Sequence, residues 1–226
     1  MTRAVISEVF FSVQGEGPYV GTPHIFVRFS GCNIRCRYCD TSAPPLETVS
    51  PAALCRRVRL LQKKYRARFL SLTGGEPLLA ADFLAEFLPR LRRLPLSVYL
   101  ETNGILIDNF KKIKEYVHVV AMDIKLPSVT AAGAFWDEHR RFLRLCAGKS
   151  VTIKMVVGRR TPLSELRRAA RLISDILPQA IVVLQPVHAQ LSPPLLQRCL
   201  QWQTALGKYL EDVRVVPQVH KLMGVM

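Results

Sequence analysis

The sequence predicts an α/β fold with a parallel sheet, and two patterns support this prediction. Short bursts of apolar and β-branched residues alternate with longer helical patterns along the chain. Repeated strand–helix units imply parallel strands joined by right-handed crossovers. This alternation permits either a doubly wound sheet or a barrel. Unusual polar residues gather at the carboxyl ends of the predicted strands, which favours a barrel, because there those ends converge on one mouth.

Apolar and β-branched residues cluster in each of the predicted strands. The strands cover residues 24–31, 69–74, 96–103, 117–125, 150–157, 180–186 and 212–218. The polar groups at or near their ends are Cys32, TGGEP (73–77), ETNG (101–104), Asp123, Lys125, Lys154 and Gln185 followed by Pro186.

Two of the predicted helices have clear signals. Ser50 followed by Pro51 is typical of an N-cap and a first helical residue. Apolar residues then recur on one face of this helix: Leu54, Val58, Leu61 and Tyr65. The same spacing recurs after Ser164: Leu166, Ala170, Ile173 and Leu177.

Length and composition are typical of one compact enzyme domain. The chain has 226 residues, 49% of them hydrophobic, and no linker-like stretch divides it, so we expect a single domain over residues 1–226. No signal peptide or membrane-spanning run is visible, which makes the cytoplasm the expected location. Cys55, Cys146 and Cys199 fall in predicted helices and are interpreted as buried thiols in a reducing compartment.

The formal net charge of +15 needs an explanation. Most basic residues fall on the polar faces of predicted helices, so solvated surface charge is the favoured interpretation. A basic RNA-binding or RNA-modifying protein is the alternative. Because no aromatic-rich RNA-binding motif is visible, we expect the activity to require no nucleic acid.

Three cysteines, Cys32, Cys36 and Cys39, form the spacing C-x3-C-x2-C, with Tyr38 before the last of them. Structural zinc and iron–sulfur sites usually close with four protein ligands, so three thiolates leave one metal position open for chemistry. Thiolates suit iron because they are soft, charged donors. A partial zinc site, or three unrelated thiols, is the alternative.

The spacing resembles the cluster loop of the radical S-adenosylmethionine (SAM) superfamily. This resemblance implies a 4Fe–4S cluster whose fourth iron is chelated by SAM, and a partial, open (β6/α3) TIM-like barrel. TGGEP resembles the superfamily element that contacts the amino group of SAM, which implies roles for Gly75 and Glu76. Two glycines also let the backbone approach a ligand closely. A glycyl-radical activating enzyme would share the cluster loop and is an alternative function.

The segment EVFFSVQGEGPYVGTPHIFVRFSGCNIRCRYCDT (8–41) resembles the 7-carboxy-7-deazaguanine synthase family. Further matches are TGGEPLL, ETNG, DIKLPS, QP and PQVHKL. The resemblance implies a carbon–nitrogen lyase that contracts 6-carboxy-5,6,7,8-tetrahydropterin to 7-carboxy-7-deazaguanine with loss of ammonia, in 7-deazapurine (queuosine) precursor biosynthesis. It also implies Mg²⁺, a homodimer and, as for other radical SAM enzymes, a flavodoxin- or ferredoxin-type electron donor.

The same resemblance assigns expected roles to individual residues, and none of them is a protein acid–base catalyst. The substrate-binding residues are Val13, Gln14, Gly15, Glu16, Arg28, Thr73, Glu101 and His220. The SAM-binding residues are Tyr38, Cys39, Asp40, Gly75, Glu76, Asn103, Asp123, Lys125 and Gln185, and Thr41 is the Mg²⁺ ligand. The side-chain chemistry of two of the substrate-binding residues suits the expected pterin. The Gln14 amide offers donors and an acceptor to a pterin edge, and the planar fork of Arg28 matches a carboxylate.

Overall fold

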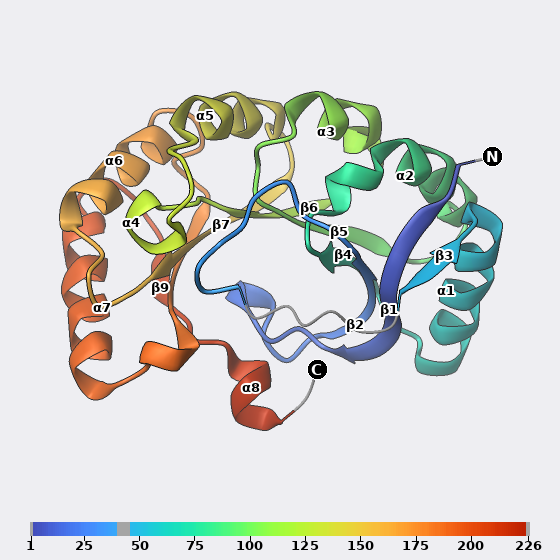
Figure 1. The fold of residues 1–226 in the computed structure, drawn as a ribbon, viewed down its shortest axis with the longest axis horizontal. Coiled ribbons are helices and arrows are strands. Elements are labelled where there is room, and N and C mark those ends of the chain that lie inside the picture. The colour runs from blue at the N-terminus through green and yellow to red at the C-terminus, as the bar shows by residue number, and fades with distance from the viewer. Residues whose placement is uncertain (1, 40–45, 225–226) are drawn as a thin grey trace.

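The computed structural model describes residues 2–39 and 46–224, and it contains one curved sheet. The nine strands follow the order β3-β1-β2-β4-β5-β6-β7-β8-β9, and the sheet does not close on itself. The strands are β1 (Ala4–Val13), β2 (Pro23–Phe29), β3 (Glu47–Val49), β4 (Phe69–Gly74), β5 (Ser97–Thr102), β6 (Val119–Asp123), β7 (Ser150–Val157), β8 (Ile181–Pro186) and β9 (Val213–Val215). The predicted α/β fold with an open, partial barrel is confirmed (Figure 1).

All of the predicted strands are present and pair in parallel from β2 to β9. The sequence analysis missed β1 and β3. β1 runs antiparallel to both β2 and β3, so it lies outside the strand–helix repeat that guided the prediction. Apolar side chains also lie on both faces of β1, because Phe10 stacks on Phe26 whereas Phe11 stacks on Tyr65. This arrangement hides the alternation expected of a half-buried strand.

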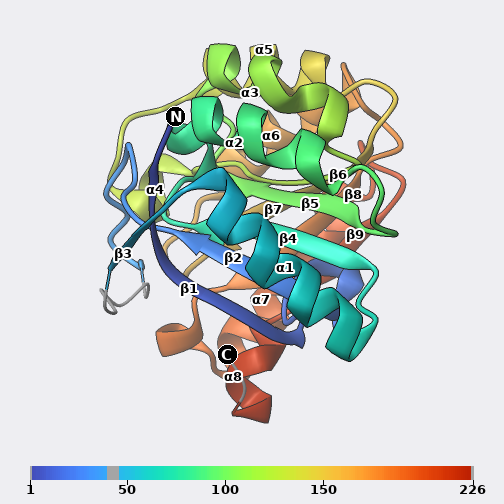
Figure 2. The same cartoon turned by 90° about the vertical axis from the view of Figure 1, so that its right-hand side faces the viewer.

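Helices cover the outer, convex side of the sheet (Figures 1 and 2). They are α1 (Pro51–Tyr65), α2 (Ala81–Phe87), α3 (Ile107–Ile113), α5 (Trp136–Leu145), α6 (Leu163–Ser174) and α7 (Pro193–Leu206). The short α4 (Pro127–Thr130) lies inside this ring of helices, and α8 (Val219–Met223) lies near the C-terminus on the open side. None of the helices in the described ranges combines the length and apolar character needed to cross a bilayer.

The predicted helix signals are largely confirmed. Ser50 caps α1 by accepting a hydrogen bond from the Ala53 backbone N–H (3.3 Å). Tyr65, on the predicted apolar face, is 39% exposed, and its ring stacks on Phe11. α6 begins at Leu163, one residue before Ser164. The thiols expected to be buried, Cys55, Cys146 and Cys199, are buried.

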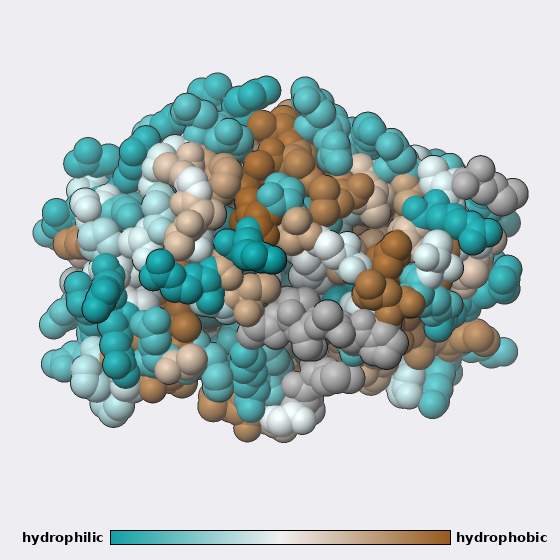
Figure 3. All heavy atoms as spheres, viewed as in Figure 1, coloured by the Kyte–Doolittle hydropathy of each residue, from teal (hydrophilic) through white to brown (hydrophobic). Residues whose placement is uncertain are grey.

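Exposed basic side chains account for much of the positive charge on α1: Arg56, Arg57, Arg59, Lys63 and Lys64. Figure 3 shows hydrophilic side chains around most of the helical periphery. This placement agrees with the interpretation of the charge as solvated surface.

Alternation along β2 separates the core from the concave side of the sheet. Ile25, Val27 and Phe29 are buried in the hydrophobic core, whereas Phe26 and Arg28 line a cavity on the other side. Because successive strand residues point to opposite faces, the same alternation places polar groups of the neighbouring strands inside the barrel.

A short 3-10 helix, η1 (Gly17–Tyr19), carries Tyr19, whose ring packs edge-on against His24 of β2, Phe69 of β4 and Tyr99 of β5 and forms a floor. The His24 ring nitrogens lie 2.7 Å from the Ser71 hydroxyl and 2.9 Å from the Thr22 hydroxyl. Burial disfavours the charged imidazole and lowers the pKa of His24 from 6.5 to about 4.

We predict that acid weakens the fold through His24. Its pKa is depressed in the folded state, so the unfolded chain binds protons more readily, and stability present at neutral pH is lost as pH falls from 6.5 towards about 4. At about 1.4 kcal/mol per pKa unit, the loss is about 3 kcal/mol. Urea unfolding of the metal-free chain across this range should show the loss, and His24→Gln should reduce it.

Burial also lowers the pKa of His139 to about 4. His139 should therefore contribute a similar loss of stability in acid, and this loss should remain in the His24→Gln variant. A change at the exposed His188, His188→Gln, is the control and should keep the parent's pH dependence. The account of the floor is wrong if His24→Gln unfolds with the same pH dependence as the parent chain.

Candidate active site

A cavity of about 560 Å³ lies on the concave side of the sheet, around the carboxyl ends of the strands. All of the predicted substrate residues line this cavity: Val13, Gln14, Gly15, Glu16, Arg28, Thr73, Glu101 and His220. Of the predicted cluster and SAM residues, those that line it are Cys32, Cys36, Tyr38, Cys39, Gly75, Asn103, Asp123, Lys125 and Gln185. Glu76 does not line it, and Asp40 and Thr41 lie outside the described residues.

The loop after β2 carries Cys32, Cys36 and Cys39 as free thiols. Its backbone is held by a hydrogen bond from the Arg37 N–H to the Thr130 carbonyl (3.0 Å). Burial raises the pKa of Cys36, although the charge of Lys125 opposes this shift. Within the described ranges, no three His, Cys, Asp or Glu side chains are placed to hold a metal ion.

Two glycines let the end of β4 lie against the cysteine loop. Gly74 has φ +124°, and a Cβ there would overlap the Phe29 carbonyl, while one on Gly75 would overlap the Gly31 carbonyl. The Glu76 N–H donates to that Gly31 carbonyl (2.8 Å). Only a residue without a side chain fits these positions, so the glycine pair fixes the distance between TGGEP and the loop.

Glu76 is buried and does not line the cavity, and its side chain links the TGGEP and ETNG motifs. One carboxylate oxygen accepts hydrogen bonds from the Thr102 hydroxyl (2.8 Å) and the Leu78 N–H (3.0 Å), and the other accepts from the Asn103 N–H (2.8 Å). Burial raises the pKa of Glu76, opposed by these hydrogen bonds. Its contacts therefore position ETNG, and the expected contact of Glu76 with SAM remains a prediction.

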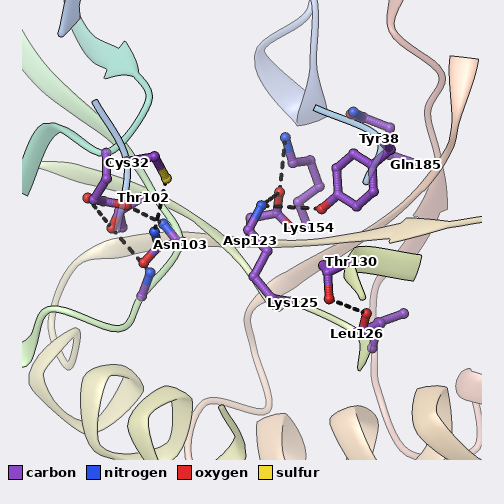
Figure 4. Close-up of polar contacts among 12 residues, drawn as sticks. Cys32, Tyr38, Thr102, Asn103, Asp123, Lys125, Leu126, Thr130, Lys154 and Gln185 are labelled. Atoms are coloured by element: carbon purple, nitrogen blue, oxygen red, sulfur yellow. Dashed lines mark hydrogen bonds and ion pairs between the residues drawn. The ribbon is translucent and has the colours of Figure 1, made fainter. Parts of the chain in front are cut away.

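Asn103 connects the strand end to the cysteine loop (Figure 4). Its side-chain amide donates to the Asn33 side chain (2.7 Å) and lies 4.0 Å from the Cys32 sulfur. The Asn103 carbonyl lies 3.1 Å from Nε2 of His139, a buried residue of α5. Because the low pKa keeps His139 neutral, Nε2–H is the donor. The sequence analysis missed His139, since a lone histidine in a helix has no spacing signal.

Three predicted substrate residues form one hydrogen-bonded group. Glu101 accepts from the Gln14 amide at one oxygen (2.9 Å) and from the Thr73 hydroxyl at the other (2.6 Å). The Gln14 carbonyl oxygen accepts from the Gly15 and Glu16 N–H groups (2.9 and 3.1 Å). These hydrogen bonds hold the three side chains together along one wall of the cavity.

Arg28 extends this wall. Its Nε lies 3.1 Å from a Glu8 carboxylate oxygen, and its guanidinium carbon lies 5.6 Å from the centre of the Phe10 ring. The expected inward orientation of Arg28 is thus present in the structure.

Glu16 receives contacts from three distant parts of the chain. Lys154 of β7 donates to one oxygen (2.7 Å), while Gln185 of β8 and Gln218 donate to the other (3.2 and 2.9 Å). Burial would raise the pKa of Glu16, but the charge and hydrogen bond of Lys154, helped by Gln218 and His220, outweigh it and lower the pKa to about 2. Lys154 stays protonated, because Glu16 and Asp123 raise its pKa despite burial.

Asp123 lies between two lysines (Figure 4). One of its oxygens lies 2.7 Å from Lys125 Nζ and 3.6 Å from Lys154 Nζ. Lys125 also donates to the Tyr38 hydroxyl (3.3 Å). The other Asp123 oxygen and the Gln185 carbonyl oxygen are buried without a hydrogen-bond partner in the described structure. A ligand in the cavity would need N–H or O–H groups to satisfy them.

Comparisons with known proteins agree on one family. The model of the radical SAM superfamily matches residues 26–183. A 7-carboxy-7-deazaguanine synthase from Geobacter sulfurreducens is 37% identical, over 98% of this chain and 97% of its own. One from Methanopyrus kandleri is also 37% identical, over 96% of this chain and 92% of its own.

A solved structure shows the same fold. The crystal structure of QueE from Escherichia coli matches with a TM-score of 0.67 at 21% identity, covering 96% of this chain and 95% of that one. At this identity the match concerns the fold, whereas the sequence matches decide the family. The chain is a radical SAM enzyme and belongs to the 7-carboxy-7-deazaguanine synthase family.

Proposed function

We propose that the enzyme converts 6-carboxy-5,6,7,8-tetrahydropterin to 7-carboxy-7-deazaguanine with loss of ammonia, as a carbon–nitrogen lyase of 7-deazapurine (queuosine) precursor biosynthesis. The observation that supports this most is 37% identity to a 7-carboxy-7-deazaguanine synthase over nearly the whole chain. The convergence of QGEG, the cysteine loop and ETNG on one cavity agrees with it. Radical SAM membership implies a 4Fe–4S cluster and SAM, which together would supply the radical chemistry needed to remove a hydrogen atom from C6 of the substrate.

The donor set fits the cluster and SAM. Cys32, Cys36 and Cys39 would hold three irons, which leaves the fourth for SAM. The unpartnered oxygens of Asp123 and Gln185 would accept the amino, ribose hydroxyl or adenine N–H donors of SAM. The other proposed SAM contacts are Tyr38, Cys39, Asp40, Gly75, Glu76, Asn103 and Lys125.

The wall formed by Gln14, Thr73, Glu101 and Arg28 suits the pterin. The Gln14, Thr73 and Glu101 group offers the donors and acceptors that a pterin edge needs, and Arg28 would bind the carboxylate through its fork. Glu16 stays ionised at working pH, so it would accept N–H donors of the ring. Val13, Gly15 and His220 complete the proposed substrate contacts. Holding both ligands in one cavity restricts their motion and excludes water.

Several parts of the proposal depend on family resemblance. Mg²⁺ would bind at Thr41 together with the substrate carboxylate, because Mg²⁺ accepts few protein ligands. A flavodoxin- or ferredoxin-type protein would supply the electron. The enzyme would act as a cytoplasmic homodimer, as a single domain over residues 1–226, without nucleic acid.

The cluster assignment predicts that anaerobic reconstitution loads about four irons per chain. Cys32→Ala, Cys36→Ala and Cys39→Ala should each lose the cluster spectrum and turnover. Cys55→Ala, a change in a buried thiol of α1, is the matched control and should keep both. Iron analysis and product mass spectrometry check this. Full turnover in any of the first three variants would refute the assignment.

Arg28→Lys keeps the charge but loses the two-pronged geometry. A charge-assisted hydrogen bond contributes roughly 1.5 to 3 kcal/mol, so carboxypterin affinity should fall by about one to two orders of magnitude while SAM affinity is unchanged. Anaerobic calorimetry on the reconstituted enzyme measures both. Glu8→Gln, which removes the ion-pair partner and leaves the fork, should weaken carboxypterin binding far less. Equal loss of affinity for both ligands in Arg28→Lys would mean that Arg28 only shapes the cavity.

The proposed magnesium site makes a separate prediction. Thr41→Val removes a hydroxyl and keeps nearly the same shape, so the variant should lose the rise of turnover with Mg²⁺ yet keep the cluster spectrum. Titration of turnover with Mg²⁺ checks it. A parent-like response would place the metal elsewhere.

A further inference from the structure

We propose that Lys154 is a positioning residue that couples binding of the pterin to binding of SAM, an inference that rests on the proposed function. Lys154 is on β7, between the strands that carry Asp123 and Gln185. Among the ion pairs of residues 2–39 and 46–224, it is the cation that pairs with two carboxylates. Of the two carboxylates, Glu16 is a proposed substrate contact and Asp123 is a proposed SAM contact.

On the substrate side, Lys154 holds the loop that carries the proposed pterin contacts. Its 2.7 Å bond to Glu16 connects β7 to a residue 138 positions away in sequence. The same loop is fixed by the Val219 N–H, which donates to the Gly15 carbonyl (2.9 Å), and by the contact of His220 with Gly15. A shift of Glu16 therefore moves the loop against the C-terminal segment.

On the cofactor side, Lys154 reaches the cysteine loop through alternating charges. Asp123 lies 3.6 Å from Lys154 and 2.7 Å from Lys125, and Lys125 donates to the Tyr38 hydroxyl. Tyr38 lies between two of the cluster cysteines in sequence. Figure 4 shows Asp123, Lys125, Lys154 and Tyr38 together. The chain of contacts runs without a break from Glu16 to the cysteine loop.

The charges in this series of contacts determine how pterin binding would affect SAM binding. Glu16 and Asp123 share one partly buried cation, so each draws it away from the other. When pterin N–H groups donate to Glu16, the hold of Glu16 on Lys154 weakens, and Lys154 can move towards Asp123. The same Asp123 oxygen already pairs with Lys125 at 2.7 Å, so a closer Lys154 would hold this oxygen from a second side and fix the carboxylate, while the other oxygen stays free for SAM donors. Coupling between two sites is reciprocal, so SAM should raise pterin affinity by the same factor.

The test is SAM affinity with and without saturating carboxypterin, measured by calorimetry on the cluster-loaded enzyme without reductant, so that no turnover occurs. In the parent chain, carboxypterin should tighten SAM binding by about fivefold or more. Lys154→Met should bring this ratio close to one, and Lys154→Arg should restore part of it. Lys208→Met removes the same charge from an exposed position and should keep the parent ratio.

Additional measurements separate positioning from folding. The melting temperature of each variant identifies unfolded samples, and Glu16→Gln provides a second break in the same chain of contacts. If Lys154→Met is too unstable, Glu16→Gln should still lower the ratio. The double variant Lys154→Met with Glu16→Gln should lose no more coupling than either single variant.

The outcomes distinguish this inference from the proposed function. Failure of carboxypterin to bind the parent chain would overturn the proposed function. Binding without any change in SAM affinity would overturn the coupling alone. A folded Lys154→Met variant with the parent ratio would also overturn the role of Lys154 and leave the proposed function in place.

Discussion

The partly buried contact between Glu16 and Lys154 is the constraint on which the site depends. It joins the loop after β1 to β7 across the concave side of the sheet, and the same carboxylate binds Gln185 and Gln218. An unpaired buried carboxylate would be costly, so the pair must form together with the fold. The loop then has one position, and this position sets both the floor at η1 and the wall of the cavity.

A second constraint acts through the backbone at the end of β4. The glycine pair lets β4 contact the cysteine loop, and Glu76 then ties ETNG to the same turn. Three motifs that are far apart in sequence are thereby held at fixed distances from one another. Such preorganisation leaves less to rearrange when reactive groups must be placed side by side.

The features that the sequence predicted were those with a local signal. The parallel strands have apolar bursts, the cysteines have a metal-ligand spacing, and Ser50 has a cap signature. β1 could not be recognised because apolar residues lie on both of its faces. His139 depends on a contact 36 residues away, which no local pattern shows. Lys154 was recognised as a strand-end residue, but its contact with Glu16, 138 residues away, was not. The hydrogen-bond partners of Glu76 were hidden for the same reason, although its motif was recognised.

The proposed function requires that one cavity hold the carboxypterin next to SAM, so that a hydrogen atom could pass directly between them. The most direct test is anaerobic turnover of carboxypterin carrying deuterium at C6, with mass analysis of product and SAM. We expect 7-carboxy-7-deazaguanine to form and deuterium to appear in SAM. Formation of product with SAM unlabelled would contradict this requirement, because the hydrogen would then have left by another route.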